Sequence, residues 1–262
     1  MTGAVSDLAV AAGPARVINA RAGSSLVLVC EHASNFIPPE FNGLGLSEAA
    51  RASHAAWDPG ALAVADGLSR RLDARLIAGG VSRLVYDCNR PPDAPDAIRA
   101  KSEVFEVPGN QNLDAAAISR RVRDFYLPFR DAIVQAMSQV PEPVLVTIHS
   151  FTPVYLGQPR DVDIGVLHDA DSRLGDAMLT LAPARTGLRV RRNQPYGPQD
   201  GVTHTLREHA IPGGRLNVML EIRNDLIATA DQQDRMAGLL AGWIADALAQ
   251  QDVTPGRGGT PC

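Results

Sequence analysis

Short, continuous runs of apolar residues recur along the chain and are separated by longer stretches of mixed character. These runs predict buried strands at residues 26–30, 75–78, 84–86, 144–148, 164–167, 188–190 and 217–222. Strands without polar alternation are typical of a mostly parallel sheet that is covered on both faces. The apolar pattern therefore predicts a sheet whose strands are all inside the molecule.

The stretches between the strands carry apolar residues at helical spacing. One set recurs every three or four residues over 118–137 and predicts a helix that Pro128 should kink or divide. A second stripe over 236–248 predicts a helix near the C-terminus, and Thr229 with Gln232 has the spacing of a capping box. Two further helices are expected at about residues 58–72 and 172–182.

Strands that alternate with helices predict a three-layer α/β/α sandwich around a mixed, mostly parallel sheet. Residues 15–252 are expected to form a single catalytic domain, and residues 1–14 and 253–262 flexible termini. In such sheets ligands bind beyond the carboxyl ends of the strands. The search for functional residues therefore begins at those ends.

Composition and charge narrow the range of functions. The formal net charge is −4, with acidic and basic residues interspersed, which argues against a nucleic-acid partner. No apolar run reaches the roughly 18 residues that a membrane span needs. The N-terminus lacks the pattern of a secretory signal, so a cytoplasmic location is expected. Cys30, Cys88 and Cys262 are far apart and form no CxxC pair, which disfavours a disulfide framework or a thiolate metal site.

Polar residues follow three of the predicted strands at the point where each strand ends. His32, His149 and Glu221 occupy such positions, and neighbouring parallel strands would bring them to one edge of the sheet. Two imidazoles and a carboxylate suit a catalytic Zn²⁺, or another divalent cation, with an open position for water. We therefore expect His32 and His149 to bind metal and Glu221 to act as general base.

The third metal ligand has two candidates. Asp58 precedes a predicted helix in the segment Ala-Ala-Trp-Asp-Pro-Gly, where its alternative role is that of a helix N-cap. Glu31 is the other candidate. Adjacent strand residues point to opposite faces, so Glu31 and His32 could both ligate only if the strand has already ended.

A substrate carboxylate would need positive charge near such a metal site, and an arginine can clamp a carboxylate with two hydrogen bonds. The candidate substrate-binding residues are Arg83, Asn89, Arg90, Ser150, Tyr196 and Arg223. The alternative for Arg83 and Arg90 is a structural salt bridge, for instance with Asp87. Tyr196 lies in a predicted loop from which it could close over the substrate.

Several segments resemble the N-formylglutamate amidohydrolase family in kind and order. They are CEHASNFIPPEF, AAWDPGA, SRLVYDCNRP, TIHSFTP, DIGVLHD, NQPYG and LEIRNDL, which together run from about residue 27 to 226. The resemblance implies a fold of the zinc-carboxypeptidase or phosphorylase/hydrolase kind with a metal at the strand ends. It also implies hydrolysis of N-formyl-L-glutamate to formate and L-glutamate in amino-acid metabolism.

By this resemblance, His32 and His149 match the two metal-binding histidines, and Glu221 matches the general base. The sequence departs from the carboxypeptidase pattern at one position. Where those enzymes place a ligating glutamate three residues after the first histidine, this chain has Asn35. Asp58 is then the expected source of the carboxylate, with Glu31 as the second candidate.

The sequence thus predicts a metal-dependent amidase that acts on a small N-acyl amino acid. Related alternatives are a deacylase or peptidase for another acyl group, and a non-catalytic protein that binds small carboxylates on the same scaffold. A serine hydrolase that uses Ser150 or Ser34 is disfavoured, because neither residue lies in a GxSxG motif.

Overall fold

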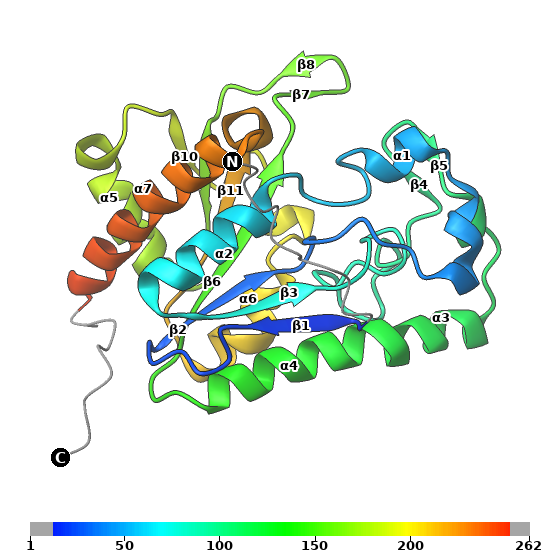
Figure 1. Cartoon of the computed structure of the whole chain (residues 1–262), viewed down its shortest axis with the longest axis horizontal. Helices are drawn as coiled ribbons and strands as arrows, with labels where there is room; N and C mark the ends of the chain where they lie inside the picture. Colours follow the sequence, from blue (N-terminus) through cyan, green and yellow to red (C-terminus); the bar gives the residue numbers. More distant parts are fainter. Residues whose placement is uncertain (1–12, 252–262) are drawn as a thin grey trace, which may run out of the picture.

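The computed structural model describes residues 13–251, and its centre is a seven-stranded mixed sheet (Figure 1). The strand order is β1-β3-β2-β6-β11-β9-β10. The strands are β1 (Ala15–Ile18), β2 (Leu26–Cys30), β3 (Arg75–Gly79), β6 (Val144–Phe151), β9 (Ile164–Leu167), β10 (Val190–Arg192) and β11 (Asn217–Arg223). The predictions that fall on residues 1–12 and 252–262 lie outside the described residues.

The four central strands β3, β2, β6 and β11 run parallel to one another. β1 is antiparallel to β3 at one edge, and β9 is antiparallel to β11 near the other, where it pairs in parallel with β10. The predicted mixed, mostly parallel sheet is therefore confirmed. Its parallel centre places the carboxyl ends of β2, β6 and β11 at the same edge.

Helices cover both faces of this sheet. The helices are α1 (Glu48–Ala52), α2 (Ala61–Leu72), α3 (Ala115–Arg121), α4 (Leu127–Ser138), α5 (Arg173–Arg185), α6 (His204–His209) and α7 (Ala230–Ala249). Short 3₁₀ segments lie at Pro39–Gly45, Pro108–Asn110, Pro198–Asp200, Ile211–Gly213 and Asn224–Ile227. Two small hairpins complete the fold: β4 (Lys101–Ser102) with β5 (Phe105–Glu106), and β7 (Val154–Tyr155) with β8 (Gln158–Pro159).

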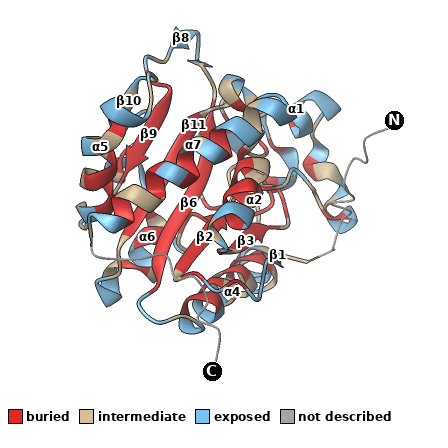
Figure 2. Ribbon diagram, turned by 60° about the vertical axis from the view of Figure 1, so that its left-hand side comes forward, coloured by how far each residue is buried: buried red, intermediate tan, exposed pale blue. Residues whose placement is uncertain are grey.

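The two faces of the sheet belong to two separate hydrophobic cores. Leu28 of β2 packs into the core formed with α2, α5 and α7. Its neighbour Val29 packs into the core that contains Phe129 and Ile133 of α4. Successive strand residues point to opposite faces, so both faces must be apolar, which explains the unbroken apolar runs. Figure 2 shows the central strands as a buried layer beneath the helices. The three-layer α/β/α sandwich is confirmed.

Local signals in the sequence agree with most helix boundaries. Thr229 and Gln232 form the predicted capping box, with Gln232 N donating to Thr229 Oγ1 at 3.3 Å. The helical stripe over 118–137 is divided, as Pro128 predicted. A π-helical turn at Val122–Tyr126 joins α3 to α4, and Pro128 lies in the first turn of α4.

Two predicted strands differ from the structure. Residues 84–86 form no strand; a turn covers residues 83–85, in which the backbone N–H of Val85 donates to the carbonyl of Ser82 at 2.9 Å. Their side chains are nevertheless fully buried, so the apolar run reports burial without strand pairing. The strand predicted at 188–190 begins only at Val190 and continues to Arg192. Within residues 13–251, no helix has the length and apolar character to cross a membrane.

Gly79 ends β3 directly beside the backbone that leads into the predicted site. A Cβ at Gly79 would lie 2.0 Å from the carbonyl oxygen of Glu31, and backbone cannot yield as a side chain can. We expect Gly79→Ala to lower the free energy of unfolding by about 1–3 kcal/mol, as overpacking does. Urea denaturation measures this change.

Gly187→Ala is the matched control, because a Cβ at Gly187 would meet no atom within 4 Å. Equal free energies of unfolding for the two variants would contradict the close approach of β3 to Glu31.

Candidate active site

The carboxyl ends of the central strands open into a cavity of about 400 Å³. His149 of β6 and Glu221 of β11 are register partners on adjacent parallel strands, so the sheet itself holds them side by side. His32 follows β2, the neighbour of β6 on the other side. All three side chains are buried and line the cavity. The convergence that the strand ends predict is therefore present.

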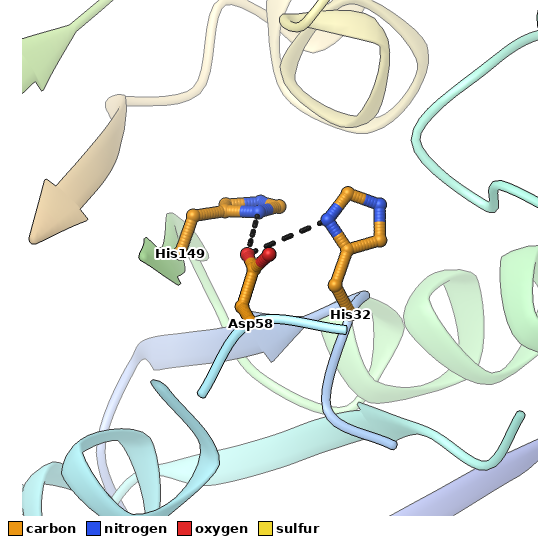
Figure 3. Close-up of side chains that lie close together, drawn as sticks. All are labelled: His32, Asp58 and His149. Atoms are coloured by element: carbon orange, nitrogen blue, oxygen red, sulfur yellow. Dashed lines mark hydrogen bonds and ion pairs between the residues drawn. The ribbon is translucent and has the colours of Figure 1, made fainter. Parts of the chain in front are cut away.

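Asp58 lies between the two histidines (Figure 3). Its Oδ2 atom is 2.9 Å from His149 Nδ1 and 3.4 Å from His32 Nδ1. Asp58 does not cap α2 with its side chain, because the N-cap of that helix is Gly60. The carboxylate is instead directed to the imidazoles, and its other oxygen pairs with Arg83.

His32, Asp58 and His149 form a group that could hold one metal ion. Each can offer one ligand atom, and these atoms lie within 4.8 Å of one another. Nδ1 of His32, which faces Asp58, is buried without a hydrogen-bond partner, and a buried orphan nitrogen is costly unless a ligand completes it. Two nitrogens and a carboxylate oxygen are the donor set that catalytic zinc prefers, so the residues present fit a divalent cation.

Each histidine is also approached by a second carboxylate on its other ring nitrogen. His32 Nε2 is 2.7 Å from Asp87 Oδ1, in a buried hydrogen bond. His149 Nε2 is 3.0 Å from Glu31 Oε2, at ion-pair distance but off the axis of a hydrogen bond. Carboxylates in this position orient metal-binding histidines and raise their basicity. Glu31, the alternative ligand, is not in the group that could hold a metal and instead lies beside Nε2 of His149.

The charges around the site set the protonation of these groups. Burial, followed by the positive charge of Arg83, lowers the pKa of His32 to about 4, so its ring is neutral as metal binding requires. Burial also acts to lower the pKa of His149, but the Glu31 carboxylate outweighs it and the pKa is raised. For Glu31 the effect of burial is in turn outweighed by His149, and its pKa falls to about 2.

Glu221 differs from the other carboxylates of the site. Its Oε2 atom is buried and has no hydrogen-bond partner among the described residues. Burial raises its pKa, and the charges of His149 and Arg83 only partly oppose this. A carboxylate with a raised pKa and a free oxygen in a cavity is suited to accept and return a proton.

Ser150 and Tyr196, two of the predicted substrate-binding residues, also line the cavity. The Ser150 hydroxyl donates to the carbonyl of Pro59 at 2.9 Å, and its backbone N–H donates to Asp58 Oδ2 at 3.2 Å. Ser150 therefore contributes mainly to fixing Asp58. The Tyr196 hydroxyl accepts a hydrogen bond from Arg160 at 2.8 Å.

Asn89 and Arg90 line the cavity, but their side chains form hydrogen bonds within the protein that stabilise the cavity wall. The Asn89 amide donates to the carbonyl of Val202 and accepts from the backbone N–H of Thr205. Arg90 is 6% exposed, and its guanidinium donates to one carboxylate and three carbonyls. The structural alternative for Arg90 therefore describes it better, with Asp96 as the carboxylate in place of the expected Asp87.

Arg223 is not brought into the cavity. Its guanidinium is 2.6 Å from Asp163 and 2.7 Å from Asp225, and it is absent from the residues that line the cavity. β11 does continue to Arg223, but the side chain turns to these acidic neighbours beyond the strand end.

The sequence did not single out several residues at the cavity. His54 and Glu103 line it and pair through His54 Nε2 and Glu103 Oε1 at 2.6 Å. Glu103 has a left-handed backbone, with φ of 54°, in the turn of the β4–β5 hairpin. A glutamate in that conformation is uncommon, and no pattern in the sequence indicates it. Arg99 and Tyr155 also line the cavity.

Comparison with known proteins identifies the family. Residues 24–228, well over half of the chain, match the family model of N-formylglutamate amidohydrolase. The chain belongs to the N-formylglutamate amidohydrolase family. This family member is accordingly an amidohydrolase, and its substrate is a small molecule. The resemblance seen in the sequence is confirmed.

Two solved structures are similar to this chain. The amidohydrolase is 52% identical to a gene product of Agrobacterium tumefaciens, with a TM-score of 0.90 over 92% of this chain and 96% of the other. It is 18% identical to the N-formylglutamate amidohydrolase of Ralstonia eutropha, with a TM-score of 0.65 over 88% of this chain and 98% of the other. At that identity the second likeness shows the fold alone. No curated protein matches the sequence.

The amidohydrolase should depend on Asp87 for metal affinity, although Asp87 is not in the group that would hold the metal. Asp87→Asn removes the negative charge that orients His32 and raises its basicity. We expect zinc affinity to fall about 10–100-fold, which is the usual effect of losing such a partner. Competition with a chromophoric chelator measures the affinity.

Asp225→Asn is the control for this prediction, since Asp225 pairs with Arg223 outside the cavity. Its zinc affinity should equal that of the wild type. An unchanged affinity in Asp87→Asn would show that Asp87 does not act on the metal through His32.

Proposed function

We propose that this amidohydrolase is a metal-dependent enzyme that cleaves the N-acyl amide bond of an acidic amino acid. N-formyl-L-glutamate is the foremost substrate, and its hydrolysis gives formate and L-glutamate. The observation that carries the proposal is the placement of Glu221 beside the His32–Asp58–His149 group in one cavity. Family membership points the same way.

His32, Asp58 and His149 would hold the metal ion. A divalent cation such as zinc supplies Lewis acidity there, which polarises a carbonyl group and lowers the pKa of a water molecule. Asp87 and Glu31 keep the two imidazoles oriented towards Asp58. Asp58, Glu31 and Asp87 bring three buried carboxylates to the site. A bound cation would offset part of the cost of burying their negative charges.

Glu221 carries the proton during hydrolysis. Water adds to the acyl carbon as Glu221 takes one of its protons, and the bond between that carbon and the amide nitrogen then breaks. Glu221 returns the proton to the departing nitrogen, so that the products are the carboxylic acid and the free amino acid. The raised pKa of Glu221 brings the carboxyl closer to the working pH, which favours both steps.

Arg83 provides positive charge beside the reacting groups. One of its nitrogens pairs with Asp58, while the side chain is 23% exposed and lines the cavity. Its remaining N–H donors can face negative charge that develops on the substrate carbonyl oxygen. Such a preorganised donor stabilises the transition state more than the ground state.

Glu221→Gln should separate chemistry from metal binding. The amide cannot accept a proton from water, so we expect kcat for N-formyl-L-glutamate to fall by about 10²–10⁴. The zinc content should stay at the wild-type level, because Glu221 is outside the metal-binding group. Turnover near that of the wild type would remove Glu221 from the proposed role.

A substrate screen tests the proposal as a whole. N-formyl, N-acetyl and N-succinyl amino acids are offered with added zinc, manganese or cobalt, and released amine is measured. We expect the highest kcat/KM for N-formyl-L-glutamate, with activity lost in chelator and restored by metal. Activity that survives full metal removal would refute metal dependence. Carboxylate binding without any turnover would favour the non-catalytic alternative.

A further inference from the structure

The arginines that line the cavity already have carboxylate partners within the protein. Arg83 pairs with Asp58. Arg90 and Arg99 share Asp96, at 2.8 Å and 2.9 Å. An acidic substrate would therefore compete with an internal carboxylate at each of these three arginines, which weakens them as its main anchor.

Arg160 follows the β7–β8 hairpin and is placed differently. Its guanidinium carbon lies 4.6 Å from the ring centre of Tyr155, 4.8 Å from that of Tyr196 and 5.5 Å from that of Phe151. It donates to the Tyr196 hydroxyl at 2.8 Å and more weakly to the carbonyl of Thr152 at 3.4 Å. Within residues 13–251, no carboxylate lies at ion-pair distance from Arg160.

A cation enclosed by aromatic rings has lost part of its hydration, and ring faces compensate only in part. Such a charge is better stabilised when an anion joins it. Arg160 is not itself among the residues that line the cavity, but it contacts four residues that are. Phe151, Thr152, Tyr155 and Tyr196 all line the cavity. Nε of Arg160 makes no hydrogen bond and is not sealed from solvent, so at least one donor stays available.

The Tyr196 hydroxyl completes this arrangement. Because its oxygen accepts a hydrogen bond from Arg160, its own proton is free to be donated to a second acceptor. A guanidinium and a phenol that converge in this way offer two donors to one carboxylate. The β7–β8 hairpin, which projects beyond the sheet in Figure 1, carries Tyr155 and leads into Arg160.

We propose that Arg160 and the Tyr196 hydroxyl form the subsite that receives a carboxylate of the substrate. This inference rests on the proposed function and deepens it, because it assigns the selection of acidic substrates to the β7–β8 side of the cavity. Arg90 and Arg223 are then structural residues, and Arg160 determines specificity without taking part in the bond cleavage.

The test compares wild type, Arg160→Met and Arg160→Lys on three substrates. These are N-formyl-L-glutamate and its two mono-amides, in each of which one carboxylate is neutral. Loss of a charge-assisted hydrogen bond predicts that Arg160→Met raises KM for the diacid roughly tenfold to a hundredfold, with little change in kcat. The same variant should leave KM nearly unchanged for the mono-amide that lacks the bound carboxylate.

Arg160→Lys should recover part of the affinity for the diacid, since it keeps the charge. Arg223→Met is the matched control, and it should leave the ratio of KM values between diacid and mono-amides unchanged. An equal rise of KM on all three substrates, or no rise on any, would overturn the subsite.

Calorimetry separates this inference from the proposed function. L-glutamate and its two mono-amides are titrated into wild type and Arg160→Met without any need for turnover. The subsite predicts that Arg160→Met binds L-glutamate and only one of the two mono-amides more weakly than the wild type does. That result supports the subsite even if no N-formyl substrate is hydrolysed. Identical binding by both proteins contradicts the subsite even if hydrolysis is observed.

Discussion

The structure depends on the burial of Asp58 between two imidazoles at the carboxyl end of the sheet. A buried carboxylate is costly unless its oxygens are satisfied, and here the fold satisfies them from several directions. Oδ2 faces both histidines and accepts from the backbone of Ser150, while Oδ1 pairs with Arg83. The Asp58 backbone also donates to the carbonyl of His32 at 2.9 Å. Asp58 thus ties β2, β6 and the entry to α2 together.

Rigid backbone keeps this contact in place. Gly60 has φ of 82°, which favours glycine, and a Cβ there would lie 2.5 Å from the carbonyl oxygen of Ile227. On the other side, the pairing of His149 with Glu221 is fixed by the parallel register of β6 and β11. The spacing between His149 and Glu221 is therefore a property of the sheet. Orphan polar atoms on His32 and Glu221 show that the fold accepts unsatisfied groups where chemistry is expected.

The sequence predicted those parts of the site that depend on the sheet. His32, His149 and Glu221 each follow an apolar run. Parallel strands bring their carboxyl ends together whatever the conformation of the connecting loops. Asp58 remained open in the sequence, since a residue before a helix can be an N-cap or a ligand. Only the structure shows Gly60 in the capping position. Residues 84–86 misled because burial, which the apolar pattern reports, does not require strand pairing.

The partners of the arginine side chains could not be predicted from the sequence. Asp96 reaches Arg90 through a loop, and Asp163 directly precedes β9, the strand that pairs with β11, so neither pairing follows a local pattern. Arg160 lies in a polar segment without periodicity. Two of the rings around it, those of Phe151 and Tyr155, are near in the chain, but the third, that of Tyr196, comes from a separate loop. Side chains on connections are placed by tertiary packing, which one-dimensional spacing does not encode.

The central claim is that His32, Asp58 and His149 together hold one cation, and zinc anomalous scattering tests it most directly. A crystal grown with zinc and measured above the zinc absorption edge should show one peak at the end of the sheet. The account predicts this peak at about 2.0–2.2 Å from a ligand atom of each of the three side chains. A peak coordinated by other residues, or no peak while Asp58 stays hydrogen-bonded to His149, would contradict it.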